Sequence, residues 1–105
     1  MKEKLKKIPS KIRIGGQDIS VKEIEKFDDG VLGRSCLGAG WIRIANAFNG
    51  EKHSESCKEN TYNHELTHVI LDTMGESELS ANEKFVSCFS GFLTEAMANA
   101  YYEEK

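Results

Sequence analysis

The chain has 105 residues, a length typical of one domain with a single hydrophobic core. Hydrophobic residues make up 39% and charged residues 30%, as in water-soluble globular proteins, and the formal net charge is −3. No basic patch for nucleic acid stands out beyond the lysines of residues 1–7, and no stretch has the apolar length of a signal peptide or a membrane span. We therefore expect one domain over residues 1–105, frayed over residues 1–9, with neither nucleic acid nor membrane as a partner.

Three cysteines lie far apart, and no two of them form a C-x-x-C pair: Cys36, Cys57 and Cys88. An odd number at such spacing argues against a disulfide framework. It also argues against a cysteine-based structural zinc site, which needs local ligand pairs. Free thiols suit a reducing compartment, so we expect a cytoplasmic protein.

The first half of the sequence predicts a small, mainly antiparallel sheet of about four strands. The candidate strands are residues 11–14, 19–21, 31–34 and 41–45. The first two alternate apolar and polar positions on either side of a glycine-containing turn, which indicates a β-hairpin. In the fourth, Ile42 and Ile44 share one face, which indicates a strand with one buried side.

The second half predicts two packed helices. Residues 56–59 fit a capping box that opens a helix running to about Met74, where Gly75 ends it. Residues 80–83 fit a second capping box, opening a helix that runs to about Tyr101. This second helix has an apolar stripe, made of Phe85, Phe89, Phe92, Leu93 and Ala96. Small residues on the roughly opposite face allow close helix packing, so we expect this helix to be flanked on two sides.

Residues 64–68 are the most informative stretch, because they read His-Glu-Leu-Thr-His within the first predicted helix. Histidines at positions i and i+4 lie about one turn apart on one helix face, so the imidazoles of His64 and His68 can converge on one metal ion. Glu65 lies near that ion without having to bind it. This is the position expected for a general base that acts on a metal-activated water.

A third protein ligand is needed, because catalytic zinc sites typically have three protein ligands and a water. The continuation H-x-x-G-x-x-H is excluded, since Leu71 and Met74 occupy the glycine and last histidine positions. His53 precedes the motif in a polar loop, where a surface role is more natural than ligation. These exclusions leave a carboxylate as the third ligand.

Glu83 is the best candidate, since it begins the second predicted helix beside the small residues expected to pack on the motif helix. Glu76 and Glu78 in the interhelical turn are alternatives, although turn carboxylates are usually solvated. Glu83 also has a purely structural explanation as the partner of Ser80 in a capping box. Its combination with the H-E-x-x-H motif favours a site that holds one Zn2+ per chain.

Residues 64–68, followed by the pair Asn82-Glu83, resemble the gluzincin pattern of thermolysin-type metallopeptidases. In that family the glutamate of an Asn-Glu pair on a second helix is the third zinc ligand, and the resemblance assigns this role to Glu83. The short chain, with strands first and helices last, is similar to minimal bacterial and phage-encoded zincin domains, including the ImmA/IrrE type. The resemblance covers roughly residues 41–94 and implies a minimal zincin-like metallopeptidase domain of the α+β class.

Two departures from the thermolysin-like pattern bear on the site. The aspartate that supports the first histidine, four residues after the ligand glutamate, is Ser87 here, and Asp72 or a backbone carbonyl is the substitute to look for. The large substrate-binding second lobe has no counterpart, which leaves the range of substrates open.

These features predict a zinc-dependent peptidase that acts on a protein or peptide substrate. In this mechanism Glu65 takes a proton from the metal-activated water and passes it to the leaving amine. We expect the strand at residues 41–45 to border the cleft and pair with an extended substrate. We also expect a residue that stabilises the oxyanion formed in the transition state, which we call the oxyanion helper. The candidates are Arg34, Arg43, His53, Tyr62, Tyr101 and Tyr102.

Two other functions fit the same residues. The first is a metal-binding regulator or partner-binding module that cleaves nothing, which the small chain, the missing lobe and Ser87 favour. The second is a protein without a metal, whose histidines are packed or exposed on an amphipathic helix. The pattern gives no indication of the oligomeric state.

Overall fold

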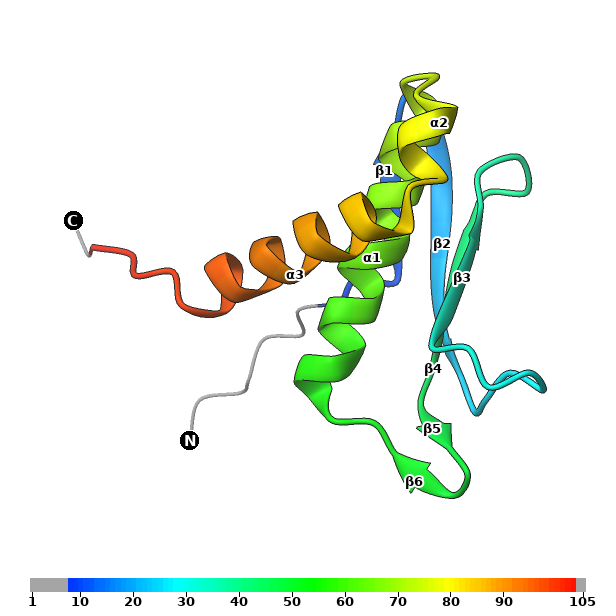
Figure 1. Ribbon diagram of the computed structural model, residues 1–105, viewed down its shortest axis with the longest axis vertical. Coiled ribbons are helices and arrows are strands. Elements are labelled where there is room, and N and C mark those ends of the chain that lie inside the picture. Colours follow the sequence, from blue (N-terminus) through cyan, green and yellow to red (C-terminus); the bar gives the residue numbers. More distant parts are fainter. Residues whose placement is uncertain (1–7, 104–105) are drawn as a thin grey trace.

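Within residues 8–103, the part of the chain that the computed structural model describes, a four-stranded sheet precedes helices α1, α2 and α3 (Figure 1). The strand order is β1-β2-β4-β3, and all neighbours are antiparallel except the pair β2 and β4. The predicted α+β fold, with a mainly antiparallel sheet followed by helices, is therefore confirmed. Of the segment expected to fray, residues 1–7 lie outside the described residues.

The predicted hairpin is formed by β1 (Lys11–Ile14) and β2 (Gln17–Ile24). Its turn residues Gly15 and Gly16 have φ angles of 57° and 81°, which glycine adopts without steric cost. β2 is longer than predicted, because it continues past the hairpin to pair with β4 along residues 20–24. This parallel pairing joins the hairpin to the rest of the sheet.

β4 (Trp41–Ala45) has the predicted bounds and lies inside the sheet, parallel to β2 and antiparallel to β3 (Gly33–Cys36). β3 begins two residues later than the predicted segment, residues 31–34. The tight connection to β4 sets this register, since the Gly40 N–H donates to the Cys36 carbonyl at 2.9 Å. β3 is consequently an edge strand, and within residues 8–103 only β4 pairs with it.

A small second sheet follows β4 and was not predicted. It consists of β5 (Ala47–Phe48) and β6 (Glu51–Lys52), which pair in an antiparallel hairpin. The turn residues Asn49 and Gly50 have φ angles of 50° and 79°, the left-handed pair that an Asn-Gly sequence favours.

α1 (Glu55–Thr73) packs on one face of the sheet and closes the hydrophobic core. Its N-cap is Ser54, which accepts from the Cys57 N–H at 3.1 Å, so the predicted capping box at residues 56–59 is wrong by two positions. The helix ends as predicted at Met74 and Gly75. Six buried residues form the core cluster: Ile19, Val21, Ile42, Ile44, Tyr62 and Val69.

α3 (Glu83–Ala98) crosses α1, and its C-terminal half extends away from the sheet (Figure 1). Its N-cap is Asn82, which accepts from the Phe85 N–H at 3.1 Å; the predicted cap at Ser80 is wrong, because that residue ends the one-turn helix α2 (Ser77–Ser80). The helix also ends before the predicted Tyr101. Only one of the two expected flanks is covered within residues 8–103, since Val86 and Ser90 are fully buried whereas the phenylalanines are exposed.

All three cysteines carry free thiols. Across residues 8–103, none of the helices has the length and apolar character needed to cross a membrane.

Candidate metal centre

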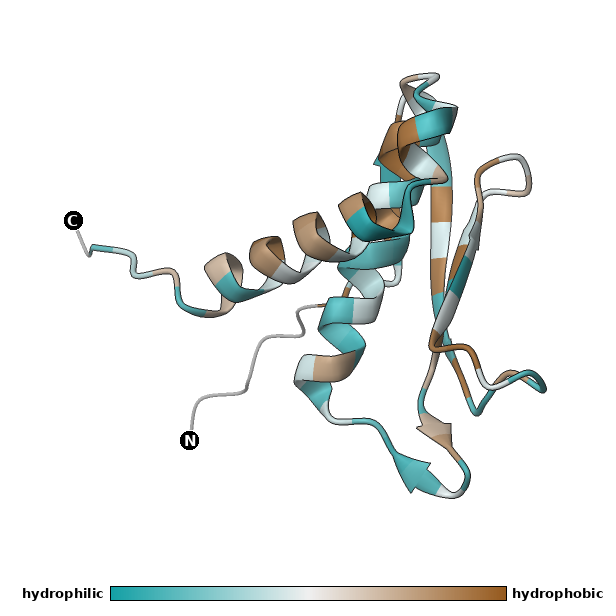
Figure 2. Ribbon diagram, in the orientation of Figure 1, coloured by the Kyte–Doolittle hydropathy of each residue, from teal (hydrophilic) through white to brown (hydrophobic). Residues whose placement is uncertain are grey.

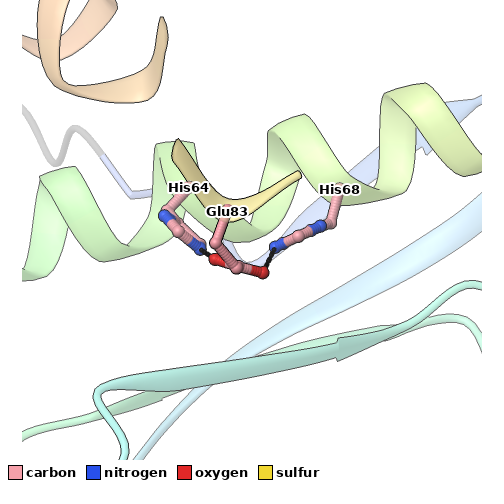
Figure 3. Close-up of side chains that lie close together, drawn as sticks. All are labelled: His64, His68 and Glu83. Carbon is pink, nitrogen blue, oxygen red and sulfur yellow. Dashed lines mark ion pairs between the residues drawn. The ribbon is translucent and has the colours of Figure 1, made fainter. Parts of the chain in front are cut away.

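The side chains of His64, His68 and Glu83 converge between α1 and the first turn of α3 (Figure 3). Both imidazoles project from one face of α1, as expected for positions i and i+4. The Nε2 atom of His64 lies 3.2 Å from Oε2 of Glu83, and Nε2 of His68 lies 3.1 Å from Oε1. The single carboxylate thus bridges the two imidazoles. The structure brings together the three residues that the sequence predicted.

The packing of α3 on α1 carries Glu83 to this position. Val86 and Ser90, one and two turns further along α3, are completely buried. Further along α3, Asn63 Nδ2 donates to Thr94 Oγ1 at 2.9 Å. Because Glu83 is the first residue of α3, its carboxylate also lies in the first turn, where the helix dipole stabilises negative charge.

These three residues can hold a metal ion, since their donor atoms all lie within 4.8 Å of one another. Ligand atoms about 2.0–2.1 Å from a tetrahedral ion lie roughly 3.3 Å apart. The two imidazole–carboxylate distances, 3.2 and 3.1 Å, are of this size, but they end on different oxygens of Glu83. Two imidazole nitrogens and one carboxylate are also a donor set that zinc accepts, with a fourth position left for water.

The alternatives to Glu83 do not reach this group. Within residues 8–103, no other set of three His, Cys, Asp or Glu side chains is arranged to hold an ion. Glu76 and Glu78 are exposed around the start of α2, and His53 lies in the loop before α1, where its backbone N–H donates to the Asn46 carbonyl. The structural role considered for Glu83, that of capping-box partner to Ser80, is also excluded, because Asn82 and not Ser80 caps α3.

Ser80 has a different role, which the sequence did not predict. It is 6% exposed, and its Oγ lies 3.1 Å from Nδ1 of His68. When Nε2 of His68 binds an ion, Nδ1 carries the proton and donates it to Ser80. With an ion at Nε2, this contact would hold the His68 ring in the orientation that ligation needs. Ser80 and Glu83 match the S-x-x-E pattern of a capping box, so nothing in the sequence indicated a contact between Ser80 and His68.

We expect Ser80→Ala to lower the affinity for zinc about 10- to 100-fold, as is typical when a partner of a ligating histidine is removed. Competition with a chromophoric chelator measures the change. Ser77→Ala, an exposed serine on the same short helix, is the matched control. Equal affinities for the Ser80→Ala variant and the unmodified chain would contradict the positioning role.

The first histidine lacks the corresponding support. In the part of the chain that the structure describes, neither Ser87 nor Asp72 forms a hydrogen bond with His64, although Asp72 lines the same cleft. The contacts of the His64 ring are the Glu83 carboxylate and the edge of the His68 ring, whose centroid is 5.0 Å away. Asp72 thus does not take over the role of the missing aspartate.

Glu65 lies beside the group formed by His64, His68 and Glu83 and lines the same cleft as these residues. Its side chain is 8% exposed, yet within residues 8–103 its carboxylate has no hydrogen bond or ion pair. The close approach of α1 to β3 is possible because residue 33 is glycine: a Cβ there would lie 2.6 Å from Cγ2 of Thr61 and 3.1 Å from Cγ of Glu65. A nearly buried carboxylate that has no polar partner within residues 8–103 and lines the cleft is a candidate proton acceptor.

The cleft has a volume of about 510 Å3 and lies between β3 and the group formed by His64, His68 and Glu83. Gly33, Arg34 and Ser35 of β3 line it, together with Trp41 at the start of β4. The prediction that residues 41–45 form the bordering strand is wrong, because both edges of β4 are already paired. The strand with a free edge at the cleft is β3.

Of the six candidates for an oxyanion helper, only Arg34 lines the cleft. Its guanidinium pairs with Asp29 and lies 5.2 Å from the centroid of the Phe27 ring. Tyr62 is a core residue, and burial raises the pKa of its phenol, which makes it a poor proton donor. The remaining candidates are Arg43, which stacks 4.0 Å from the Trp41 ring, His53, and the exposed Tyr101 and Tyr102 beyond α3.

No protein-family model, curated protein or solved structure matches this chain. The assignment of a function therefore depends on the geometry of the site.

Proposed function

We propose that this protein is a zinc-dependent metallopeptidase of the minimal gluzincin type, which hydrolyses peptide bonds. The observation that carries the proposal is the position of Glu65. This carboxylate is unpaired within residues 8–103, is almost buried, and shares one cleft with two histidines and a glutamate that can hold an ion. A site that only stored a metal would have no use for a further carboxylate beside the three residues that can hold the ion.

His64, His68 and Glu83 are the proposed ligands of one zinc ion, the histidines neutral and the glutamate ionised. These residues would hold the ion, which would supply Lewis-acid chemistry toward a substrate carbonyl and a water. Glu65 accepts the proton of the attacking water and delivers it to the amine that leaves. Ser80 keeps the His68 ring in place during these steps through the contact with Nδ1.

The free edge of β3 is the proposed binding place for the substrate backbone. An extended peptide that pairs with Gly33, Arg34 and Ser35 would lie along the cleft with its backbone hydrogen bonds satisfied. Arg34 is the proposed oxyanion helper, because it is the one candidate at the cleft and its charge is fixed. The substrate would therefore be an unfolded or flexible segment, not a folded surface.

A second candidate function is a metal-binding regulatory module without activity. Within residues 8–103, neither Ser87 nor Asp72 hydrogen-bonds to His64, and this favours the regulatory module, since a ligand without such a partner is less well oriented for catalysis. The free thiols suit a cytoplasmic location for either function.

One experiment separates these functions. The purified chain is incubated with a peptide library, with zinc or with a chelator, and the products are read by mass spectrometry. We expect cleavage only with zinc. Metal analysis that finds one zinc per chain, without cleavage of any peptide, would favour the regulatory module. Absence of bound zinc would contradict both functions.

Zinc should also stabilise the fold, because an ion that binds only the folded chain adds its binding free energy to the stability. At free zinc about 100-fold above Kd, the gain is about 2.7 kcal/mol, which raises the Tm of a chain this size by about 10 °C. Thermal unfolding followed by circular dichroism, with zinc and with a chelator, measures the shift. Identical Tm values would contradict ligation by the folded site.

A further inference from the structure

The exposed side of α3 carries an apolar stripe that nothing within residues 8–103 covers. Phe85, Phe89 and Phe92 are 36%, 50% and 71% exposed, and the ring centroids of the first two lie 5.9 Å apart in a stacked arrangement. Figure 2 shows brown, hydrophobic bands that repeat along one side of α3, the upper side in this view. We call the surface formed by Phe85, Phe89, Phe92 and Ala96 the phenylalanine stripe.

The spacing of the phenylalanine stripe is that of a helix-pairing seam. Its positions, 85, 89, 92 and 96, follow each other at intervals of four, three and four residues. This is the a/d repeat by which one helix packs against another. The helix-to-helix contact inside this chain uses a different face of α3, the one with the fully buried Val86 and Ser90. The stripe is therefore a second pairing surface.

Charges beside the stripe indicate which helix covers it. Lys84 and Glu95 lie about three turns apart on the same flank of the phenylalanine stripe. Within residues 8–103, neither side chain has an ion-pair partner. In an antiparallel pair of identical helices centred on the stripe, Lys84 of each copy comes opposite Glu95 of the other. A parallel pair would instead place the charged flanks of the two helices on opposite sides of the interface, where Lys84 and Glu95 would not meet.

We propose that α3 pairs with α3 of a second copy of this chain, in an antiparallel arrangement with twofold symmetry, through the phenylalanine stripe. Such an interface is isologous, since the same stripe serves both copies. The metal centre stays open, because Glu83 and its contacts with α1 lie on a different side of α3 from the stripe. The proposal does not depend on the presence of zinc or on catalysis.

The exposed area limits how tight this dimer is. With about 200 Å2 for a fully exposed phenylalanine, the three rings leave roughly 300 Å2 in water, a size at which apolar patches commonly are interaction sites. Two copies would bury roughly twice that, and flanking side chains bring the total near the low end of specific interfaces, about 1,000 Å2. We therefore expect a dimer with a Kd in the micromolar range.

Analytical ultracentrifugation of the chain from low micromolar to near-millimolar concentration tests the proposal. We expect a monomer–dimer equilibrium that Phe92→Gln shifts to monomer, with Kd raised about 100-fold. Phe48→Gln is the matched control, because Phe48 is 47% exposed on β5. A monomer at every concentration, or equal weakening by both substitutions, would overturn the proposal.

Charge reversal tests the antiparallel arrangement separately. Lys84→Glu and Glu95→Lys should each raise Kd about tenfold, because each places two pairs of equal charges across the interface. The double variant Lys84→Glu/Glu95→Lys should restore the original Kd, since it only exchanges the partners. Both positions are exposed on the helix surface, so the variants fold. Failure of the double variant to recover dimerisation would contradict the arrangement.

Discussion

The substitution Glu65→Gln is expected to abolish peptide hydrolysis, while the chain still binds one zinc ion. The amide keeps the size of the side chain but cannot accept a proton, and loss of a general base typically costs about 10^2- to 10^4-fold in rate. Because the Glu65 carboxylate has no polar partner within residues 8–103, its replacement breaks no hydrogen bond or ion pair there. Initial rates on a peptide that the unmodified chain cleaves measure the effect.

The control for this experiment is Asp72→Asn, which removes a second carboxylate that lines the same cleft. That variant should retain most of the activity, since Asp72 is not among the three residues that can hold the ion. Zinc content and Tm of both variants show that the site and the fold are intact. Full activity of the Glu65→Gln variant would end the assignment of Glu65 as the base.

Replacement of Glu83 is expected to have the largest effect on metal binding. Glu83→Ala removes the carboxylate that contacts both imidazoles, at 3.2 and 3.1 Å, and within residues 8–103 it leaves only the two histidines of the group that could hold an ion. Zinc sites depend on three or four protein ligands, so we expect the affinity to fall by more than about 100-fold. Isothermal titration calorimetry with zinc measures this loss.

Glu78→Ala is the matched control, because Glu78 is an exposed carboxylate on α2, five positions before Glu83 in the sequence. It should leave the zinc affinity unchanged. Glu83→Gln adds a further test, since it keeps the N-terminal turn of α3 but weakens the ligand. Zinc affinity that survives in the alanine variant would return Glu83 to a purely structural role.

The sequence predicted the elements that local chemistry determines. The Gly15-Gly16 turn, the strand of Trp41–Ala45 and the end of α1 at Gly75 are all encoded by neighbouring residues. The grouping of His64, His68 and Glu83 was also predictable, because a fixed helical spacing and one downstream carboxylate were enough to define it.

Features that depend on packing between distant segments were not predictable. Nothing local indicates that β2 extends to pair in parallel with β4, which leaves β3 at the edge beside the cleft. The prediction of residues 41–45 as the bordering strand was wrong for this reason. Ser80 was also misinterpreted, since its contact with His68 depends on how α2 folds back over α1.

The free edge of β3 has a consequence for the solubility of the chain. An unpaired strand edge is a template on which further chains can add, the first step of aggregation. β3 is only four residues long and carries the positive charge of Arg34, while β1, at the other edge of the four-stranded sheet, carries Lys11 and Arg13. These charged side chains, which pair with Asp29 and Asp18, must be desolvated before a second sheet can approach edge to edge. The edge is thus long enough for a short peptide, but too short and too charged to seed a growing stack of strands.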